Sequence, residues 1–165
     1  MSLQERIQTD IAVAMRGGDA LRRDVLRMAS SAAYNVQKRN QRPLSEDEFL
    51  AVLSHEVKTR RESVDAFRGG GREDLATKEE REIAILTEYL PEPLTEAEVG
   101  VLVRQAIAET GATSTRDMGR VMGWLTVRTR GRADGKRVSK LVGQALAGAD
   151  GAAGVDLATR GPGRP

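Results

Sequence analysis

Cysteine is absent from the sequence. The absence excludes disulfide bonds, thiolate metal sites and a cysteine nucleophile, and it suits a reducing compartment. We therefore expect a cytoplasmic location.

Long apolar runs are also lacking. No stretch approaches the roughly 20 apolar residues that cross a bilayer, and the segment from Met1 to Arg6 has no apolar signal core. We expect a soluble protein that does not associate with a membrane.

Aromatic residues are scarce, at 3% of the chain, whereas charged residues reach 30%. The apolar residues present are mainly Ala, Leu, Val, Ile and Met, which suit contacts between helices. This composition, with no strand-like alternation, predicts an all-α fold.

Three capping boxes mark the starts of predicted helices, at Ser2 to Glu5, Ser45 to Glu48 and Thr95 to Glu98. The first precedes apolar residues spaced by four, four and three, which end at the glycines at 17–18. A second helix follows Asp19, a third runs from 45 to the glycines at 69–71, and a fourth covers about 72–89. We expect residues 1–91 to form a bundle of about four helices whose first two make a hairpin.

Pro91 and Pro93 stop the fourth helix and mark a short, stiff domain boundary. Apolar periodicity then predicts three helices, so we expect residues 92–147 to form a small three-helix subdomain. Residues 148–165 offer little to bury, and we expect a disordered tail.

Charge is unevenly distributed beneath a net charge of +2. Residues 72–110 carry 4 basic and 10 acidic side chains, whereas residues 111–147 carry 8 basic and 2 acidic ones. A local basic excess is a possible electrostatic footprint of a polyanion such as RNA.

The basic cluster that we select as an RNA contact comprises Arg128, Arg130, Arg132, Lys136 and Arg137. Arginine forks match phosphate oxygens, and backbone N–H groups at the start of the last helix should point the same way. Arg116, Arg120 and Lys140 are expected to flank the cluster. The alternative is a solvated, arginine-rich turn.

A second basic run, Lys58, Arg60 and Arg61, falls on the predicted third helix, and we select Lys58 and Arg61 as a further RNA contact. Its alternative interpretation is neutralisation by helix ion pairs with Glu56, Glu62 and Asp65.

Sequence motifs that would indicate a catalytic, metal or cofactor site are otherwise weak. The glycines at 69–71 follow a helix and lack the lysine and hydroxyl of a phosphate loop, and His55 is the only histidine. Glu79, Glu80 and Glu82 are interpreted as an exposed helix face, and Trp124 as a core or rim residue. We expect no catalytic residue, no metal and no cofactor.

Several runs, in order and spacing, resemble the GatB/YqeY family from about Leu3 to Leu146. They are Lys-Thr-Arg-Arg-Glu-Ser at 58–63, Gly-Arg-Glu-Asp-Leu at 71–75, Glu-Tyr-Leu-Pro at 88–91, Asp-Met-Gly-Arg-Val-Met-Gly at 117–123 and Gly-Arg-Ala-Asp-Gly at 131–135. The family is similar to the C-terminal tail of the B subunit of glutamyl/aspartyl-tRNA amidotransferases. Related modules are appended to a glutaminyl-tRNA synthetase in some bacteria.

The resemblance implies a helical N-terminal subdomain, a three-helix C-terminal one and an association with tRNA, with an aminoacyl-tRNA synthetase or amidotransferase as a possible partner. It also carries the family-level label of carbon–nitrogen ligase with glutamine as amido-N donor. We hypothesise a tRNA-binding module that is not catalytic by itself. The alternatives are an accessory chain in tRNA amidation, and a protein–protein adaptor that uses the acidic fourth helix.

Overall fold

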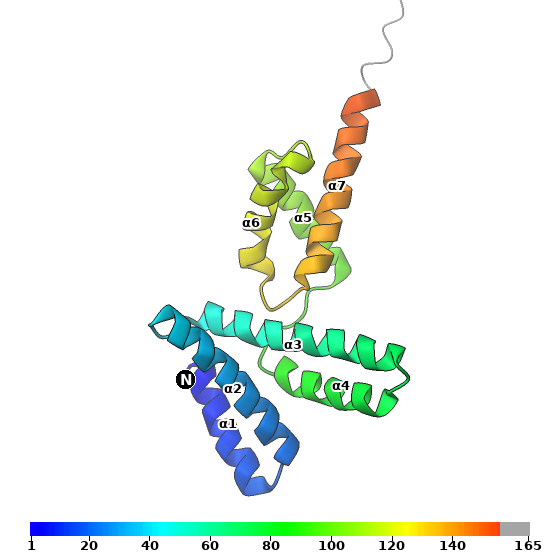
Figure 1. The fold of residues 1–165 in the computed structure, drawn as a ribbon. Helices are drawn as coiled ribbons and strands as arrows, with labels where there is room; N and C mark the ends of the chain where they lie inside the picture. The colour runs from blue at the N-terminus through cyan, green and yellow to red at the C-terminus, as the bar shows by residue number, and fades with distance from the viewer. Residues whose placement is uncertain (156–165) are drawn as a thin grey trace, which may run out of the picture. The chain divides into compact units, whose positions relative to one another are not determined.

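The structure is a computed structural model that describes the secondary structure of residues 1–155 and the side chains of residues 1–149 (Figure 1). Within those residues it contains seven α-helices, one 3-10 turn and no strand, which confirms the all-α prediction. No helix in this part of the chain is long and apolar enough to cross a membrane.

The chain divides into two compact units, Met1–Glu92 and the residues from Pro93 onward. The first unit contains α1 (Leu3–Gly17), α2 (Ala20–Asn40), α3 (Glu46–Gly69) and α4 (Glu73–Thr87). The second contains α5 (Glu96–Thr110), the 3-10 turn η1 (Thr115–Asp117), α6 (Met118–Thr129) and α7 (Gly135–Val155).

Local sequence signals start and stop these helices. The hydroxyls of Ser2, Ser45 and Thr95 accept from backbone N–H groups in the first turns of α1, α3 and α5, and all three reciprocal capping boxes are present. Gly18 and Gly111 end α1 and α5 in the left-handed conformation, which glycine adopts without a steric penalty.

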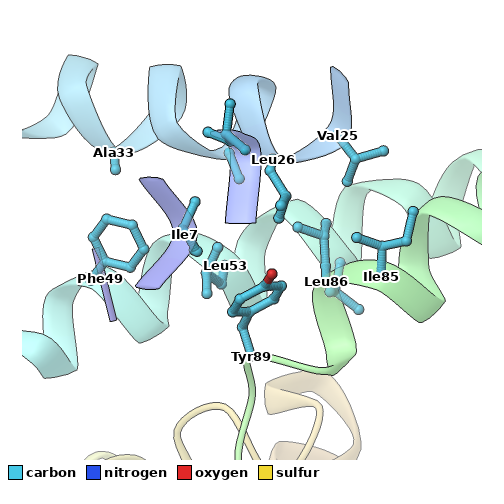
Figure 2. Packing of buried hydrophobic residues seen from close by; sticks show 12 residues of the cluster. Ile7, Val25, Leu26, Ala33, Phe49, Leu53, Ile85, Leu86 and Tyr89 are labelled. Atoms are coloured by element: carbon cyan, nitrogen blue, oxygen red, sulfur yellow. The ribbon is translucent and has the colours of Figure 1, made fainter. Parts of the chain in front are cut away.

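The core of the first unit lies where its four helices meet (Figure 2). Ile7, Leu26, Leu53 and Leu86, one from each helix, are fully buried. Such burial stabilises by about 1.5–3 kcal/mol per side chain. The four helices therefore share one core.

Tyr89 ties the end of α4 to α1. Its ring lies within the core cluster (Figure 2), and its hydroxyl donates to Asp10 at 2.5 Å. Burial, together with the hydrogen bond to Asp10, raises the pKa of Tyr89 to about 12. Next to it, Glu88 accepts two hydrogen bonds from Arg22 of α2, at 2.8 and 2.9 Å.

A buried ion cluster joins α3 to α4. Arg60 is 5% exposed and Glu82 is 8% exposed. The guanidinium of Arg60 donates to Glu82 at 2.9 Å and to the Glu56 carboxylate at 2.8 Å. Burial alone would lower the pKa of Arg60, but these hydrogen bonds outweigh it and hold the pKa above its ordinary value.

The ion cluster corrects two interpretations of the sequence. Glu82 is not part of an exposed acidic face, and Arg60 is not part of a surface basic run. Arg60 lies on the buried stripe of Leu53, Val57 and Val64, since the four positions are spaced by four, three and four residues.

The second unit has its own core. Val121 and Leu125 of α6 pack with Val138, Val142 and Leu146 of α7 and with Val99 and Val103 of α5. Trp124 is partly buried at the margin of this cluster, in agreement with its interpretation as a core or rim residue.

The helix α7 continues to Val155, past the end that we predicted at 147. The tail predicted at 148–165 therefore overlaps the end of this helix. Residues 156–165 of the predicted tail lie outside the described residues.

Replacing Glu82 with Ala should lower the free energy of unfolding by about 3 kcal/mol, because the buried Arg60 would keep only Glu56 as a partner. Urea denaturation followed by circular dichroism measures the change. Glu80→Ala is the matched control on the same helix, since Glu80 forms an exposed pair with Arg68. The control should change stability by less than about 0.5 kcal/mol. Equal losses in the two variants would contradict a buried cluster.

Stability should fall as pH rises from 10 toward 12. The pKa of Tyr89 rises from 10.0 to about 12 on folding, so its contribution is fully present below pH 10 and is lost as pH approaches the folded-state value. Tyr89→Phe should be less stable at neutral pH by about 1 kcal/mol, and its stability should decline less above pH 10. Tyr34→Phe, at a 62% exposed position, is the control. Parallel declines in all three proteins would refute the assignment.

Candidate nucleic-acid interface

The turn between α6 and α7 brings together the basic residues selected from the sequence. Arg128 lies in the last turn of α6, Arg130 caps that helix, Arg132 lies in the turn, and Lys136 and Arg137 begin α7. We call these five residues the turn cluster.

Backbone hydrogen bonds define the shape of this turn. The N–H groups of Arg132 and Ala133 both donate to the Thr129 carbonyl, at 2.9 and 3.0 Å. Gly131, which lies between Thr129 and Arg132, has a φ of +73°. The carbonyl of Arg132 accepts from the Leu94 N–H at 2.7 Å, which joins the turn to the segment before α5. The turn thus has a defined backbone on which charged side chains are displayed.

Arg128 is held against Trp124. Its guanidinium carbon lies 3.6 Å from the centre of the Trp124 ring, and it donates to the Trp124 carbonyl at 2.7 Å. The indole N–H donates in turn to Glu109 of α5 at 2.9 Å. Arg128 is therefore exposed but already oriented by these contacts.

The start of α7 is already capped. The Asp134 carboxylate accepts from the Lys136 N–H at 3.2 Å. We expected the backbone N–H groups at this helix start to be open to a phosphate. The Asp134 carboxylate already occupies one of them. Arg137 forms an ion pair with Glu96 at the start of α5, so its charge is partly compensated within the unit.

Arg130 and Lys140 are exposed and form no ion pair within the described residues. Lys140 lies one turn beyond Lys136 on α7. These two side chains give the turn and the adjoining face of α7 most of their uncompensated positive charge.

Arg120 lies near the start of α6, whereas Arg128 lies in its last turn. It pairs with Asp117 at 2.6 Å and donates to the Thr110 carbonyl at 3.0 Å. Backbone hydrogen bonding from Thr113 and the Arg120 guanidinium lower the pKa of Asp117 to about 2. Arg120 thus bridges the α5–α6 connection, and a contact of Arg120 with RNA stays a prediction. Arg116 lies in η1, also at this end of α6.

The second basic run lies in the other unit. Lys58 and Arg61 are exposed on α3, while Arg60 between them is buried in the ion cluster. Only two of the three side chains therefore remain at the surface.

The acidic α4 is largely paired. Glu73 and Glu80 bind Arg68, and Asp74 binds Arg72. No group of three or more metal-ligating His, Cys, Asp or Glu side chains occurs in the described part of the chain.

One family model and two relatives match this chain. The family model described as Yqey-like protein matches residues 4–146. A relative from Pyrenophora tritici-repentis, named altered inheritance of mitochondria protein 41, mitochondrial, is 32% identical over 141 residues, which cover 83% of this chain and 77% of that protein. An uncharacterized protein of Schizosaccharomyces pombe is 38% identical over 55 residues, which cover 33% of this chain and 45% of that protein.

The family model spans all seven helices from α1 to most of α7, including the turn cluster and the buried Arg60. The chain belongs to the family of Yqey-like proteins.

Proposed function

We propose that this protein is a tRNA-binding module that is not catalytic by itself and that contacts the RNA backbone through the turn cluster and Lys140. The observation that carries the proposal is the placement of these basic side chains around one turn of the second unit. Lysine and arginine side chains that neutralise phosphates supply most of the nonspecific affinity for nucleic acids.

The local charge balance supports an anionic partner. Residues 111–147 contain 8 basic and 2 acidic side chains, and one of those acids, Asp117, is already paired with Arg120. The other, Asp134, caps α7 within the turn. An RNA phosphate would gain the attraction of Arg130 and Lys140 without first breaking an ion pair.

The stacked Arg128 supports a defined contact. Its contacts with Trp124 fix the guanidinium before binding, so less side-chain entropy is lost when it meets a phosphate. Arg128 also covers a face of the indole, which makes Trp124 a poor platform for a nucleobase. The module is therefore expected to recognise shape and phosphates rather than a single-stranded sequence.

The resemblance to the tail of the amidotransferase B subunit supports tRNA as the particular RNA. On this proposal, the partner enzyme is an aminoacyl-tRNA synthetase or an amidotransferase. The carbon–nitrogen ligase label would then describe the assembly rather than this chain, which serves as its accessory tRNA contact.

We infer a reducing compartment as the place of action, with the cytoplasm as the first expectation. The fungal relative is named as a mitochondrial protein, so an organelle is the alternative. Cell fractionation distinguishes the two.

Replacing Arg128, Arg130 and Arg132 with Glu should leave helical content unchanged, since these side chains lie outside the apolar core. Affinity for tRNA should collapse, because phosphate attraction becomes repulsion. The slope of log affinity against log salt should become shallower by somewhat less than about one unit per lost contact. Electrophoretic shifts with total tRNA at several salt concentrations measure both quantities. A mutant with the parent's affinity and slope would redirect attention to Lys58 and Arg61.

A charge-matched pair of variants separates position from net charge. Two sets of two cations serve here, and all four are exposed and form no ion pair among the described residues. The first set is Arg130 and Lys140, and the second is Arg104 and Arg116. Replacing either pair with Glu changes the net charge equally. We expect the first double variant to lose at least about tenfold more affinity for tRNA than the second. Equal losses would indicate a diffuse electrostatic effect and would argue against this site.

The purified chain should neither release ammonia from glutamine nor hydrolyse ATP, because it has no cysteine and no phosphate-loop sequence. Ammonia and phosphate assays with and without tRNA measure these activities. Reproducible glutaminase activity that one point substitution abolishes would overturn the non-catalytic assignment.

A further inference from the structure

A groove in the first unit has no role in the proposed RNA contact. It has a volume of about 820 Å³ and lies between the C-terminal half of α2 and the N-terminal half of α3. Its lining on α2 includes Ala32, Asn35, Val36 and Arg39, which are three or four residues apart along one helix face. Its lining on α3 includes Glu48, Ala51, Val52 and His55. Residues spaced by three and four share one helix face, so two helix faces form the walls.

The floor of the groove is apolar. Ala32, Val36, Ala51 and Val52 line it and are only partly buried, although each lies beside core residues such as Ala33 and Phe49. The two alanines leave room for a close approach of another backbone. An amphipathic helix fits such a surface by placing residues i, i+3, i+4 and i+7 on the floor.

The rim of the groove retains positive charge, because Glu48 is paired with Arg42 and Glu56 shares the single charge of Arg60 with Glu82. Glu48 accepts from Arg42 at 2.6 and 2.8 Å, and Glu56 accepts from Arg60 at 2.8 Å. Lys38 and Arg39, by contrast, are exposed and form no ion pair within the described residues. The occupant is thus expected to carry negative charge beside the end of α2.

RNA fits this surface poorly. The lining contains no Phe, Tyr or Trp on which a base could stack, and the imidazole of His55 is the one ring that it holds. Phosphates would lose water against an apolar floor. A helix with carboxylates at its flanks satisfies both the floor and the rim.

We propose that the groove binds an acidic amphipathic helix of a protein partner, with the apolar stripe of that helix on Ala32, Val36, Ala51 and Val52 and its carboxylates beside Lys38 and Arg39. The groove is built from the first unit alone and the turn cluster from the second. The module therefore has separate surfaces for a protein and for RNA. The proposal does not depend on tRNA binding.

The test uses the full chain and fluorescein-labelled helical peptides of about 15 residues, or roughly 22 Å of helix. The acidic peptide carries Leu at alternating three- and four-residue spacing and Glu elsewhere. A second peptide replaces every Glu with Lys, and a third scrambles the acidic sequence. Fluorescence anisotropy should show saturable binding of the acidic amphipathic peptide alone.

Replacing Lys38 and Arg39 with Glu should weaken the binding of the acidic peptide by about tenfold or more. The same change should allow the Lys peptide to bind. Arg16→Glu is the matched control, since Arg16 is also an exposed cation in the last turn of a helix of the same unit. It should leave both affinities unchanged. Ala51→Glu should abolish binding by placing a charge on the floor, with a thermal melt to check folding. Because the rim residues are exposed, the reversal tests the proposal even if Ala51→Glu unfolds.

Three results would overturn the proposal. One is equal binding of the acidic and scrambled peptides, or of the parent and the rim variant. Another is loss of tRNA affinity in the rim variant without any peptide binding, which would assign the groove to RNA. The third is a dimer in sedimentation velocity that Ala51→Glu dissociates, which would make the occupant a second copy of the chain. The peptide and sedimentation measurements do not depend on whether the turn cluster binds tRNA.

Discussion

The burial of Arg60 is the constraint that organises the first unit. A guanidinium cannot be deprotonated to escape burial, so it must find carboxylates inside the protein. Glu56 supplies one from the same helix, and Glu82 supplies the other from α4. The pair of α3 and α4 is thereby held at one register, because sliding either helix by a turn would leave a buried charge alone.

Other contacts of the first unit follow from that register. With α4 placed along α3, its C-terminal end reaches α1 and α2, where Tyr89 donates to Asp10 and Glu88 accepts from Arg22. The groove lies between α2 and α3, and its lining includes Glu56, which binds Arg60, and Glu48, which binds Arg42. Lys38 and Arg39 are the cations of that lining that form no ion pair within the described residues.

The second unit places charge by a different principle. Its core is apolar apart from the buried Thr129, whose hydroxyl donates to the Leu125 carbonyl. The turn cluster lies around a turn whose backbone is fixed by hydrogen bonds with Thr129 and Leu94. Arg128 is oriented by an aromatic ring rather than by a carboxylate, so its positive charge is retained. A protein with one surface suited to phosphate and another suited to a helix would join an RNA to a partner chain, which is the role that we propose for it.

The sequence by itself determined the all-α class, the three capping boxes and the proline boundary, because each depends on residues within a few positions of one another. It also indicated the grouping of Arg128, Arg130 and Arg132, since neighbours along a turn are neighbours in space. Only the tertiary structure decided that Glu82 meets Arg60, that Arg120 reaches the Thr110 carbonyl at the end of α5, and that α2 and α3 enclose a groove. These features depend on contacts between separate helices, and the relative placement of helices follows from packing and the pairing of buried charge, which local spacing does not specify.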